Sequence, residues 1–356
     1  MAGTSVLQDA RPTFLVDGQT LPAVAEGLLG MLIIENSNGL YRCEALFGNW
    51  GDVKGSQSFL YFDRKVIDFG KSFTVKYGTD TLFDGRIMAL EANFLEGRSP
   101  ELNVLAEDRF QDLRMTRRTR TFTDVSDADV IRQIASEQGL SPNVDVSGPQ
   151  YKVLAQLNLS DLAFLRERAR TIDAELWMDG KKLNAVAHTK RAGGSLSLAY
   201  GREVRAFSVL ADLAHQRTSV SVSGWDVGGK TMIQHEASAD VLGGELNGDT
   251  SGPSILATAF GTRKESLVHT VPLGSQEAQA QAESFMKISA RRFVVGHGVA
   301  DITSQMRVGT KLELLELGPL FSGKYYVTEV RHLFSLDMRG IRTEFTVERP
   351  GLGQAG

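Results

Sequence analysis

The chain has 356 residues, of which 42% are hydrophobic and 23% are charged, and its formal net charge is −4. These values are typical of a folded protein of two or three domains and exclude a disordered chain. The charge is too small to indicate nucleic acid or an anionic membrane as a partner.

The number of cysteines indicates the cellular compartment, and the numbers of glycines and prolines indicate the fold class. Cys43 is the only cysteine, which excludes an intramolecular disulfide and a thiolate metal cluster and is typical of a reducing cytosol. MAGTSVLQDARPTF has no signal-peptide pattern, and the longest apolar run, LLGMLII (28–34), is much shorter than the about 20 residues of a membrane span. We therefore expect a soluble protein. The 36 glycines and 9 prolines favour β structure with many tight turns.

The first half of the chain contains one clear strand and two helices. Apolar and polar residues alternate in SFTVKYG (72–78), as in a strand with one buried face. A helix is predicted within 123–142, with Ser126 or Asp127 as its N-cap. SDLAFLRERARTI (160–172) repeats this design, with a serine at its start and an apolar stripe on one face.

The second half is mostly strands. Asp179-Gly180 predicts a two-residue hairpin turn. One more helix is predicted, at 275–290, from apolar residues four and three positions apart. Period-two alternation predicts strands in RTSVSVSGW (217–225), KLELLELG (311–318) and RTEFTVER (342–349).

An internal repeat is the most informative pattern. The segments 69–94 and 308–334 both run glycine, alternating strand, glycine, then Leu-Phe-x-Gly-[Arg/Lys] and a second strand. Four matching pairs are each 238 residues apart: Phe83 and Phe321, Gly85 and Gly323, Arg86 and Lys324, Glu91 and Glu329. This spacing predicts one β unit used twice. Two unrelated hairpins that share common turn residues are the alternative.

GWDVGGKT (224–231) fits the P-loop pattern G-x-x-x-x-G-K-[ST]. The strand before a P-loop lies in a parallel sheet covered on both faces and is apolar throughout, whereas serines and valines alternate here. The following residues lack the apolar stripe of a helix, and no Walker B strand follows. We interpret 226–229 as a hairpin turn that leaves Lys230 exposed.

No other motif defines a reaction site. GLGQAG (351–356) spells a dinucleotide-binding pattern, but no helix can follow it, and we expect 350–356 to be a flexible tail. The six histidines are at least 20 residues apart, so none forms a local metal-binding pair. Cys43 lies in a strand-like segment and is expected to be buried. We therefore assign no catalytic, cofactor-binding or metal-binding residue.

The densest basic segment is RFQDLRMTRRTR (109–120), with five arginines. Two interpretations stay open: contact with an acidic partner or polyanion, and a solvated connector between domains. Nucleic-acid binding would require interleaved aromatic residues and a basic domain, which the segment lacks. The sequence does not determine which partner Arg114–Arg120 would contact.

Taken in order, the motifs resemble the phage late control protein D family and the hub region of VgrG, the tail-hub proteins of contractile injection machines. The matching segments are IDFGKSFTVKYG…LFDGRIMALE (67–91), RTRTFTDVSDADVIRQIASEQGL (118–140), QLNLSDLAFLRERARTIDAELWMDGKKL (156–183), SVSGWD (221–226), EAQAQAESFM (277–286) and LFSGKYYVTEVRHLFSLDMRGIRTEFTVER (320–349). Each motif alone is common, but their order along the chain is specific.

The resemblance implies a mainly β fold with α/β insertions: two tail-tube-like antiparallel β-barrels per subunit plus a mixed α/β region. It places the first barrel at 1–110 and the mixed region at 111–194 with 236–294. The second barrel would occupy 195–235 with 295–349, followed by the tail.

The resemblance also implies a structural function without catalysis. Such hubs form a homotrimeric ring, in which two barrels per subunit give six positions around the axis. The ring would connect a hexameric tail tube to a trimeric spike, with baseplate wedge or neighbouring baseplate proteins as further partners. Because the chain lacks the OB-fold and needle of VgrG, we expect a separate spike protein. We expect synthesis in the bacterial cytoplasm and assembly into a virion or phage-tail-like particle.

Two other functions are alternatives. One is an enzyme, either a nucleotide hydrolase that uses 224–231 or a cell-wall hydrolase with unidentified carboxylates. The other is a glycan-binding tail module, which the presence of only three tryptophans disfavours.

Overall fold

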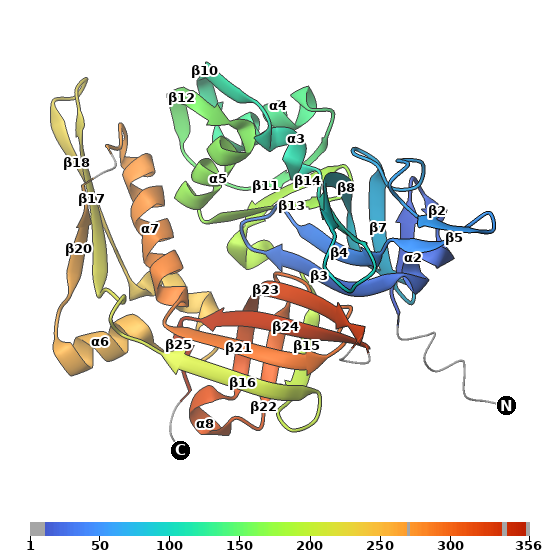
Figure 1. Cartoon of the computed structure of the whole chain (residues 1–356). Coiled ribbons are helices and arrows are strands. Elements are labelled where there is room, and N and C mark those ends of the chain that lie inside the picture. The colour runs from blue at the N-terminus through green and yellow to red at the C-terminus, as the bar shows by residue number, and fades with distance from the viewer. Residues whose placement is uncertain (1–10, 269–270, 337–339, 354–356) are drawn as a thin grey trace.

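The computed structural model describes residues 11–268, 271–336 and 340–353. One sheet of 13 strands runs through two β units that lie side by side, and helices and smaller sheets pack around them (Figure 1). The fold is therefore mainly β with a mixed α/β region, as predicted. No helix in these described ranges is long and apolar enough to cross a membrane.

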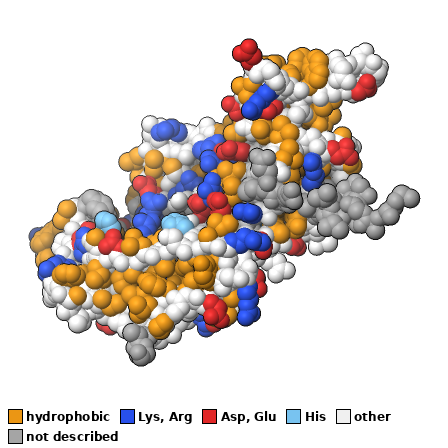
Figure 2. All heavy atoms as spheres, turned by 60° about the horizontal axis from the view of Figure 1, so that its bottom comes forward, with side chains coloured by type: hydrophobic (Ala, Val, Ile, Leu, Met, Phe, Trp, Pro, Cys, Tyr) orange, Lys and Arg blue, Asp and Glu red, His pale blue; other side chains and the backbone are white. Residues whose placement is uncertain are grey.

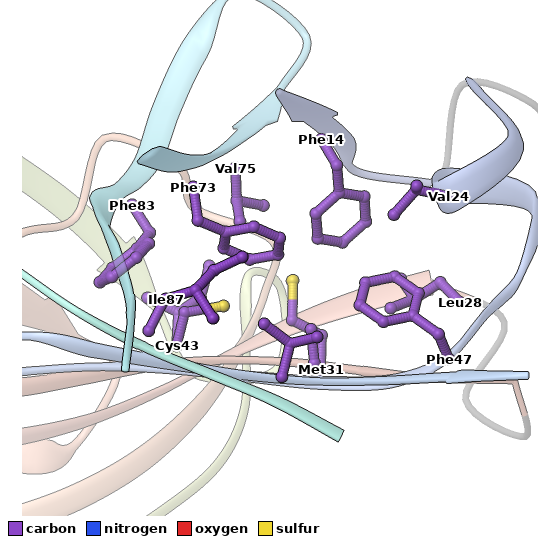
Figure 3. Packing of buried hydrophobic residues seen from close by; sticks show 14 of the residues in the cluster. Phe14, Val24, Leu28, Met31, Cys43, Phe47, Phe73, Val75, Phe83 and Ile87 are labelled. Atoms are coloured by element: carbon purple, nitrogen blue, oxygen red, sulfur yellow. The ribbon is translucent and has the colours of Figure 1, made fainter. Parts of the chain in front are cut away.

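The first β unit contains six strands around an aromatic core. They are β1 (Thr13–Val16), β3 (Leu28–Asn36), β4 (Arg42–Gly48), β7 (Ser72–Tyr77), β8 (Asp80–Asn93) and β9 (Glu101–Glu107), in the spatial order β3-β4-β9-β8-β7-β1. Phe14, Phe47 and Phe73 are fully buried between them (Figure 3). The rings of Phe14 and Phe47 meet edge to face at 5.3 Å, a favourable aromatic geometry. Shorter elements complete the unit: β2 (Gln19–Thr20), α2 (Pro22–Glu26), β5 (Trp50–Val53) and β6 (Ser56–Phe59).

The second β unit also contains six strands and has its own core. They are β15 (Ser195–Ala199), β16 (Val204–Ala211), β21 (Val294–Asp301), β22 (Lys311–Leu315), β23 (Gly323–Ser335) and β24 (Gly340–Arg349). Their spatial order is β16-β21-β24-β23-β22-β15. The short helix α8 (Gly318–Phe321) lies between β22 and β23.

The two units have the same strand order in the chain and the same neighbours in space. The counterparts are β1 and β15, β3 and β16, β4 and β21, β7 and β22, β8 and β23, and β9 and β24. One difference is that β1 pairs antiparallel with β7, whereas β15 pairs parallel with β22. The structure therefore supports a duplicated β unit rather than two unrelated hairpins.

Register irregularities recur at matching places in the two units. The β8–β9 register shifts across Met88, and the β23–β24 register shifts across Thr328. The β3–β4 register shifts across Leu29, and the β16–β21 register across Arg205. Since a bulge is a specific local feature, two shared bulges strengthen the equivalence.

The repeated sequence letters are not all structurally equivalent. Phe83 lies in β8, whereas Phe321 lies in helix α8, which the first unit lacks. Met88 and Thr328, the residues at matching bulges, are 240 and not 238 positions apart. The offset of 238 is thus wrong by two residues within these strands.

The α/β region following the first unit consists of two small sheets and three helices. The strands are β10 (Arg117–Ser126) paired with β12 (Gln150–Ser160), and β11 (Ser141–Asp145), β13 (Ala174–Asp179) and β14 (Lys182–Ala187). The helices are α3 (Phe110–Arg114), α4 (Asp127–Glu137) and α5 (Asp161–Thr171). Ser126 caps α4 in a capping box with Asp129, and Ser160 caps α5, as the sequence predicted. Asp179 pairs with Lys182, so the hairpin turn lies one residue later than predicted.

A further sheet and helix project beside the second unit. They are β17 (Ser219–Asp226), β18 (Thr231–Ser238), β20 (Lys264–Leu267) and α7 (Ser275–Arg291). We expected residues up to 235 in the second barrel, but β17 pairs with β18 and β20 instead. The reason is a separate core: Val220 and Val222 of β17 pack with Ala282 of α7.

The remaining short elements connect these parts. They are the 3-10 helices η1 (His188–Lys190) and η2 (Ala239–Glu245), strand β19 (Thr250–Ser251), helix α6 (Gly252–Phe260) and strand β25 (Gly351–Leu352). β25 pairs with β19, so the expected flexible tail at 350–356 begins as an ordered strand. Residues 354–356 of that tail lie outside the described residues.

Candidate assembly surfaces

The large sheet has one continuous outer face that crosses from the second unit to the first. β23 pairs antiparallel with β3, from Glu329 opposite Asn36 to Ser335 opposite Gly30, and this pairing joins the two units. Outward side chains alternate with core residues along each strand. On the second unit they include His297, Asp301, Arg331, Arg342, Glu344 and Thr346. His297, Arg331, Glu344 and Thr346 line a shallow hollow of about 530 Å³ over β16, β21, β24 and β23.

Opposite charges meet across the strands of this outer face. The Arg331 guanidinium lies 3.2 Å from the Glu344 carboxylate of the neighbouring strand. A second hollow, of about 550 Å³, extends from Glu329 and Arg331 to Arg42 and Glu107 of the first unit. Since solvent screens such pairs, they stabilise the fold little. The outer face is best described as a hydrated surface of mixed charge.

An ion pair with a buried carboxylate lies at the joint between the two units. Glu35 of β3 is only 2% exposed, and it pairs with Arg307, which precedes β22 of the second unit. The backbone N–H of Val308 donates to the same carboxylate at 3.3 Å. Burial, assisted by the nearby Arg307 charge, lowers the pKa of His332 on β23 to about 4, so this histidine is neutral at pH 7. The joint is therefore held by a carboxylate that is almost fully buried and by an arginine whose side chain stays partly exposed.

A second buried polar network attaches the α/β region to the second unit. Glu175 of β13 accepts hydrogen bonds from His188 Nδ1 at 2.7 Å, Arg191 at 2.7 Å and the Tyr326 hydroxyl at 2.8 Å. Arg191 also donates to the Tyr41 hydroxyl of the first unit at 2.6 Å. Burial alone would raise the pKa of Glu175, but the His188 hydrogen bond and the Arg191 charge outweigh it and lower the pKa to about 2. We interpret this network as structural, because every member has a partner.

The P-loop-like segment is the tip of a β-hairpin, as the sequence analysis indicated. β17 and β18 pair antiparallel up to Asp226 opposite Thr231. The Asp226 carboxylate accepts from the backbone N–H groups of Gly228 and Gly229 at 2.9 and 3.1 Å. Lys230 is exposed, in a left-handed conformation (φ 50°). The residues after it form a strand and not a helix, so the structural context of a P-loop is missing.

The single cysteine and the described histidines do not form a common site. Cys43 is fully buried in the first core, and burial raises the pKa of its thiol well above the ordinary value. Within the described ranges, no three His, Cys, Asp or Glu side chains form a group that could hold a metal ion.

The arginine-rich segment is largely neutralised by its own surroundings. Arg118 and Arg120 both contact Asp161, at 3.2 and 2.9 Å, and Arg120 also contacts Glu137 at 2.5 Å. Arg114 pairs with Glu107, and further along the segment Arg117 donates to a backbone carbonyl. The arrangement fits a bridging connector better than a polyanion-binding patch.

Sequence analysis missed an exposed aromatic cluster on the first unit. Phe94 follows β8 and is 64% exposed, and its ring lies 5.9 Å from Phe62 and 6.3 Å from Phe59. Trp50 contacts Phe59 at 5.1 Å. These residues come from the β5–β6 hairpin and two loops, so no periodic pattern in the sequence could reveal them. Exposed apolar clusters of this kind mark interaction surfaces.

A second apolar surface lies on the other unit. Figure 2 shows hydrophobic side chains gathered over the side of the molecule that faces down in Figure 1, where β16, β22 and α8 lie. Leu315 (40%) and Leu320 (39%) are exposed on these elements, whereas Leu210 (64%) of β16 alternates with the core-facing Val209 and Ala211 and so lies on the outer face of the sheet. The chain thus has apolar surfaces on both units, as a subunit of an assembly would.

Comparison with known structures places the fold among phage tail proteins. The chain is similar to the 43 kDa tail protein of prophage MuSo2 from Shewanella oneidensis, with a TM-score of 0.70 and 13% identity over 96% of this chain and 98% of that one. It is also similar to a tail protein from Neisseria meningitidis, with a TM-score of 0.69 and 12% identity over 96% and 97% of the two chains.

A third similar structure comes from a secretion system. It is an E. coli component of the type VI secretion system, described as structurally similar to the T4 bacteriophage tail proteins gp27 and gp5. The TM-score is 0.56, with 12% identity over 96% of this chain and 79% of that chain. At such identities the likeness concerns the fold.

The family of the chain follows from a sequence comparison. The model of the family described as the Alg8 N-terminal domain matches residues 14–335, so the chain belongs to that family. This description names no reaction, ligand or partner. A search of curated protein sequences found no match.

Proposed function

We propose that this chain is a structural hub protein of a contractile injection particle, either a phage tail or a tail-like particle. Three copies form a ring that adapts a hexameric tail tube to a trimeric spike. The observation that carries this proposal is the duplicated six-stranded unit, with equal strand order, equal neighbours and shared bulges. Two equivalent units in each of three subunits give six similar positions, so a threefold ring offers a nearly sixfold surface.

The continuous outer face of the sheet is the surface best suited to the central channel. Its side chains are polar and of mixed charge, so it remains hydrated and holds a passing polymer weakly. The apolar surfaces on both units then face neighbouring subunits, tube or spike, because obligate interfaces are more hydrophobic than channels. The spike, the tube and the baseplate wedge proteins are separate chains in this proposal, and the chain is made in the bacterial cytoplasm and assembled into a virion or phage-tail-like particle.

The state of assembly tests this proposal directly. Mass photometry of the purified chain, alone and mixed with the tube and spike proteins encoded beside it, is expected to show a trimer. Negative-stain images of the same mixtures should show a threefold ring with a central channel. A chain that stays monomeric in every mixture would contradict the hub function.

The proposal includes no catalytic role, and two assays address the enzyme alternatives. Calorimetric titration with Mg-ATP is expected to show no binding for the wild type or for Lys230→Ala, because Lys230 lies on a hairpin tip. A peptidoglycan zymogram is expected to show no clearing. Saturable ATP binding that Lys230→Ala abolishes, or clearing on the zymogram, would reopen the enzyme alternatives.

A further inference from the structure

Strand β8 has a free edge where its counterpart β23 is covered. β7 pairs with β8 as far as Arg86, and the backbone of Ile87 bonds to Gly70 and Lys71 just before β7; beyond Ile87, β8 has β9 on one side and no strand of the described residues on the other. In β23, the equivalent stretch from Glu329 to Ser335 pairs with β3 on that side. Because the matching bulges at Met88 and Thr328 are 240 residues apart, this stretch corresponds to residues 89–95.

Strand β16 has a free edge where its counterpart β3 is covered. β3 lies between β4 and β23. Among the described strands, β16 pairs with β21, and its other edge carries one isolated bridge, at Val204. The matching register and bulge of the β3–β4 and β16–β21 pairs make Ile34 of β3 equivalent to Leu210 of β16. Each chain therefore has two free strand edges, one on each unit, which correspond to the two strands that pair at the internal β3–β23 joint.

We propose that β16 of one copy pairs antiparallel with residues 89–95 of the next copy and so repeats the β3–β23 joint between subunits. This inference rests on the proposed ring. The internal joint places Arg331 opposite Ile34, and the equivalent pair between copies is Glu91 opposite Leu210. In the same register, Phe94 lies opposite Phe207. Edge pairing of this kind adds main-chain hydrogen bonds and removes two exposed edges at once.

The exposure of equivalent residues supports this joint. At the internal joint, Ile34 is 9% and Phe334 is 5% exposed. Their counterparts at the free edges, Leu210 and Phe94, are both 64% exposed. Apolar side chains thus stand uncovered at the places where the internal joint buries them. A second copy of the chain is the occupant whose edge has the matching shape and register.

The free edges of β16 and β8 cannot pair with each other within a single chain. β16 and β8 belong to different units, with six strands between them in the sheet. Figure 1 shows them on different sides of the molecule. The contact is therefore heterologous, and such contacts close into a ring when the rotation between copies permits. Six similar joints, three within chains and three between them, would complete the ring.

Cysteine cross-linking of the full chain tests the register. The native Cys43 is fully buried and can stay. The double variant Glu91→Cys with Leu210→Cys is expected to form covalent dimers and trimers on mild oxidation. The control, Glu91→Cys with Ala206→Cys, displaces one partner by four residues, about 13 Å along the strand, and is expected to give only background. Each single variant should remain uncross-linked.

A pair of aromatic variants tests the energetics. Phe94→Ser is expected to raise the concentration at which the trimer dissociates by at least about tenfold. Trp225→Ser, which changes another aromatic residue that is more than half exposed (53%) on the projecting sheet, is expected to leave the trimer unchanged. Circular dichroism of both variants confirms that the monomer fold is intact.

The possible outcomes distinguish a failure of the proposed strand pairing from a failure of the proposed trimeric ring. A trimer in which the Glu91–Leu210 pair fails to cross-link, or in which the Glu91–Ala206 pair cross-links equally well, overturns the proposed joint and leaves the hub function standing. Absence of any trimer, with or without tube and spike proteins, overturns both. Cross-linking of the matched pair only, with loss of trimer in Phe94→Ser, establishes the joint.

Discussion

Glu175 shows how single buried residues hold the parts of this chain together. Its carboxylate receives donors from η1, from the segment that follows it and from β23, so one side chain connects the α/β region with the second unit. Arg191, its main charge partner, is 4% exposed and also stacks over the Trp177 ring at 4.3 Å. Removing one partner of such a pair leaves an uncompensated buried charge, which is costly.

Replacing Glu175 by Gln is therefore expected to lower the free energy of unfolding at pH 7 by about 3–5 kcal/mol. The matched control is Asp145→Asn, which removes the partner of Lys190 in an ion pair with both side chains more than half exposed. That change is expected to cost less than about 1 kcal/mol. Urea unfolding of the three proteins measures both differences.

The pH dependence of the Glu175 contribution has a definite sign. The pKa of Glu175 is about 2 in the folded chain, below the about 4.3 of an unfolded chain. Its contribution to stability is fully present above the unfolded pKa and is lost as the pH falls toward the folded pKa. The stability difference between wild type and Glu175→Gln should therefore shrink between about pH 5 and pH 2. A difference that stays constant over this range would contradict the assignment.

At the scale of elements, the duplicated unit also shares the way its hairpins begin. Gly70 precedes β7 with φ +78°, and its N–H donates to the Ile87 carbonyl at 2.9 Å. Gly309 precedes β22 with φ +91°, and its N–H donates to the Val327 carbonyl at 2.9 Å. Both glycines occupy a backbone region that other residues adopt at a cost. Only their surroundings differ.

Alanine at these two positions is expected to have unequal effects. Gly70→Ala should cost about 1–2 kcal/mol, because a Cβ there meets nothing within 4 Å and only the backbone is strained. Gly309→Ala should cost more, because its Cβ would lie 2.7 Å from Arg191, which the Glu175 network holds in place. Thermal unfolding of both variants measures the difference. Equal costs would mean that Arg191 moves freely and that the network is loose.

Local rules predicted most of the individual elements from sequence. The caps Ser126 and Ser160 identified two helix starts, since a capping side chain acts within its own turn. The alternating serines and valines of β17 identified a half-exposed strand and so argued against a P-loop. Alternation could not show which sheet β17 joins. That depends on β20 and α7, whose contacts with β17 are distant in sequence.

At the scale of the whole molecule, the sequence predicted the duplication but not the joints. The repeat was visible because glycine and turn residues recur, whereas the β3–β23 pairing connects residues about 300 positions apart and has no local signal. The aromatic cluster around Phe94 was missed for the same reason. The two joints also differ chemically: Glu35, which pairs with Arg307 inside the chain, corresponds to Ala211 in β16. The joint between copies therefore lacks the Glu35–Arg307 ion pair.

Because the joint between copies lacks this ion pair, we expect the ring to dissociate into subunits before the two units within one subunit separate. Hydrogen–deuterium exchange of the wild-type ring, and of Phe94→Ser at a concentration at which this variant is a monomer, should show loss of protection at β16 and at residues 89–93 in the monomer. The amides of β3 and β23 should stay protected in both, because their joint lies within one chain and is fixed by the Glu35–Arg307 pair. Equal exchange of β16 in ring and monomer would show that this edge is free in the ring. Parallel loss at β3 and β23 would show that the two units separate within the chain, and the rigid double unit that gives a threefold ring six positions would not exist.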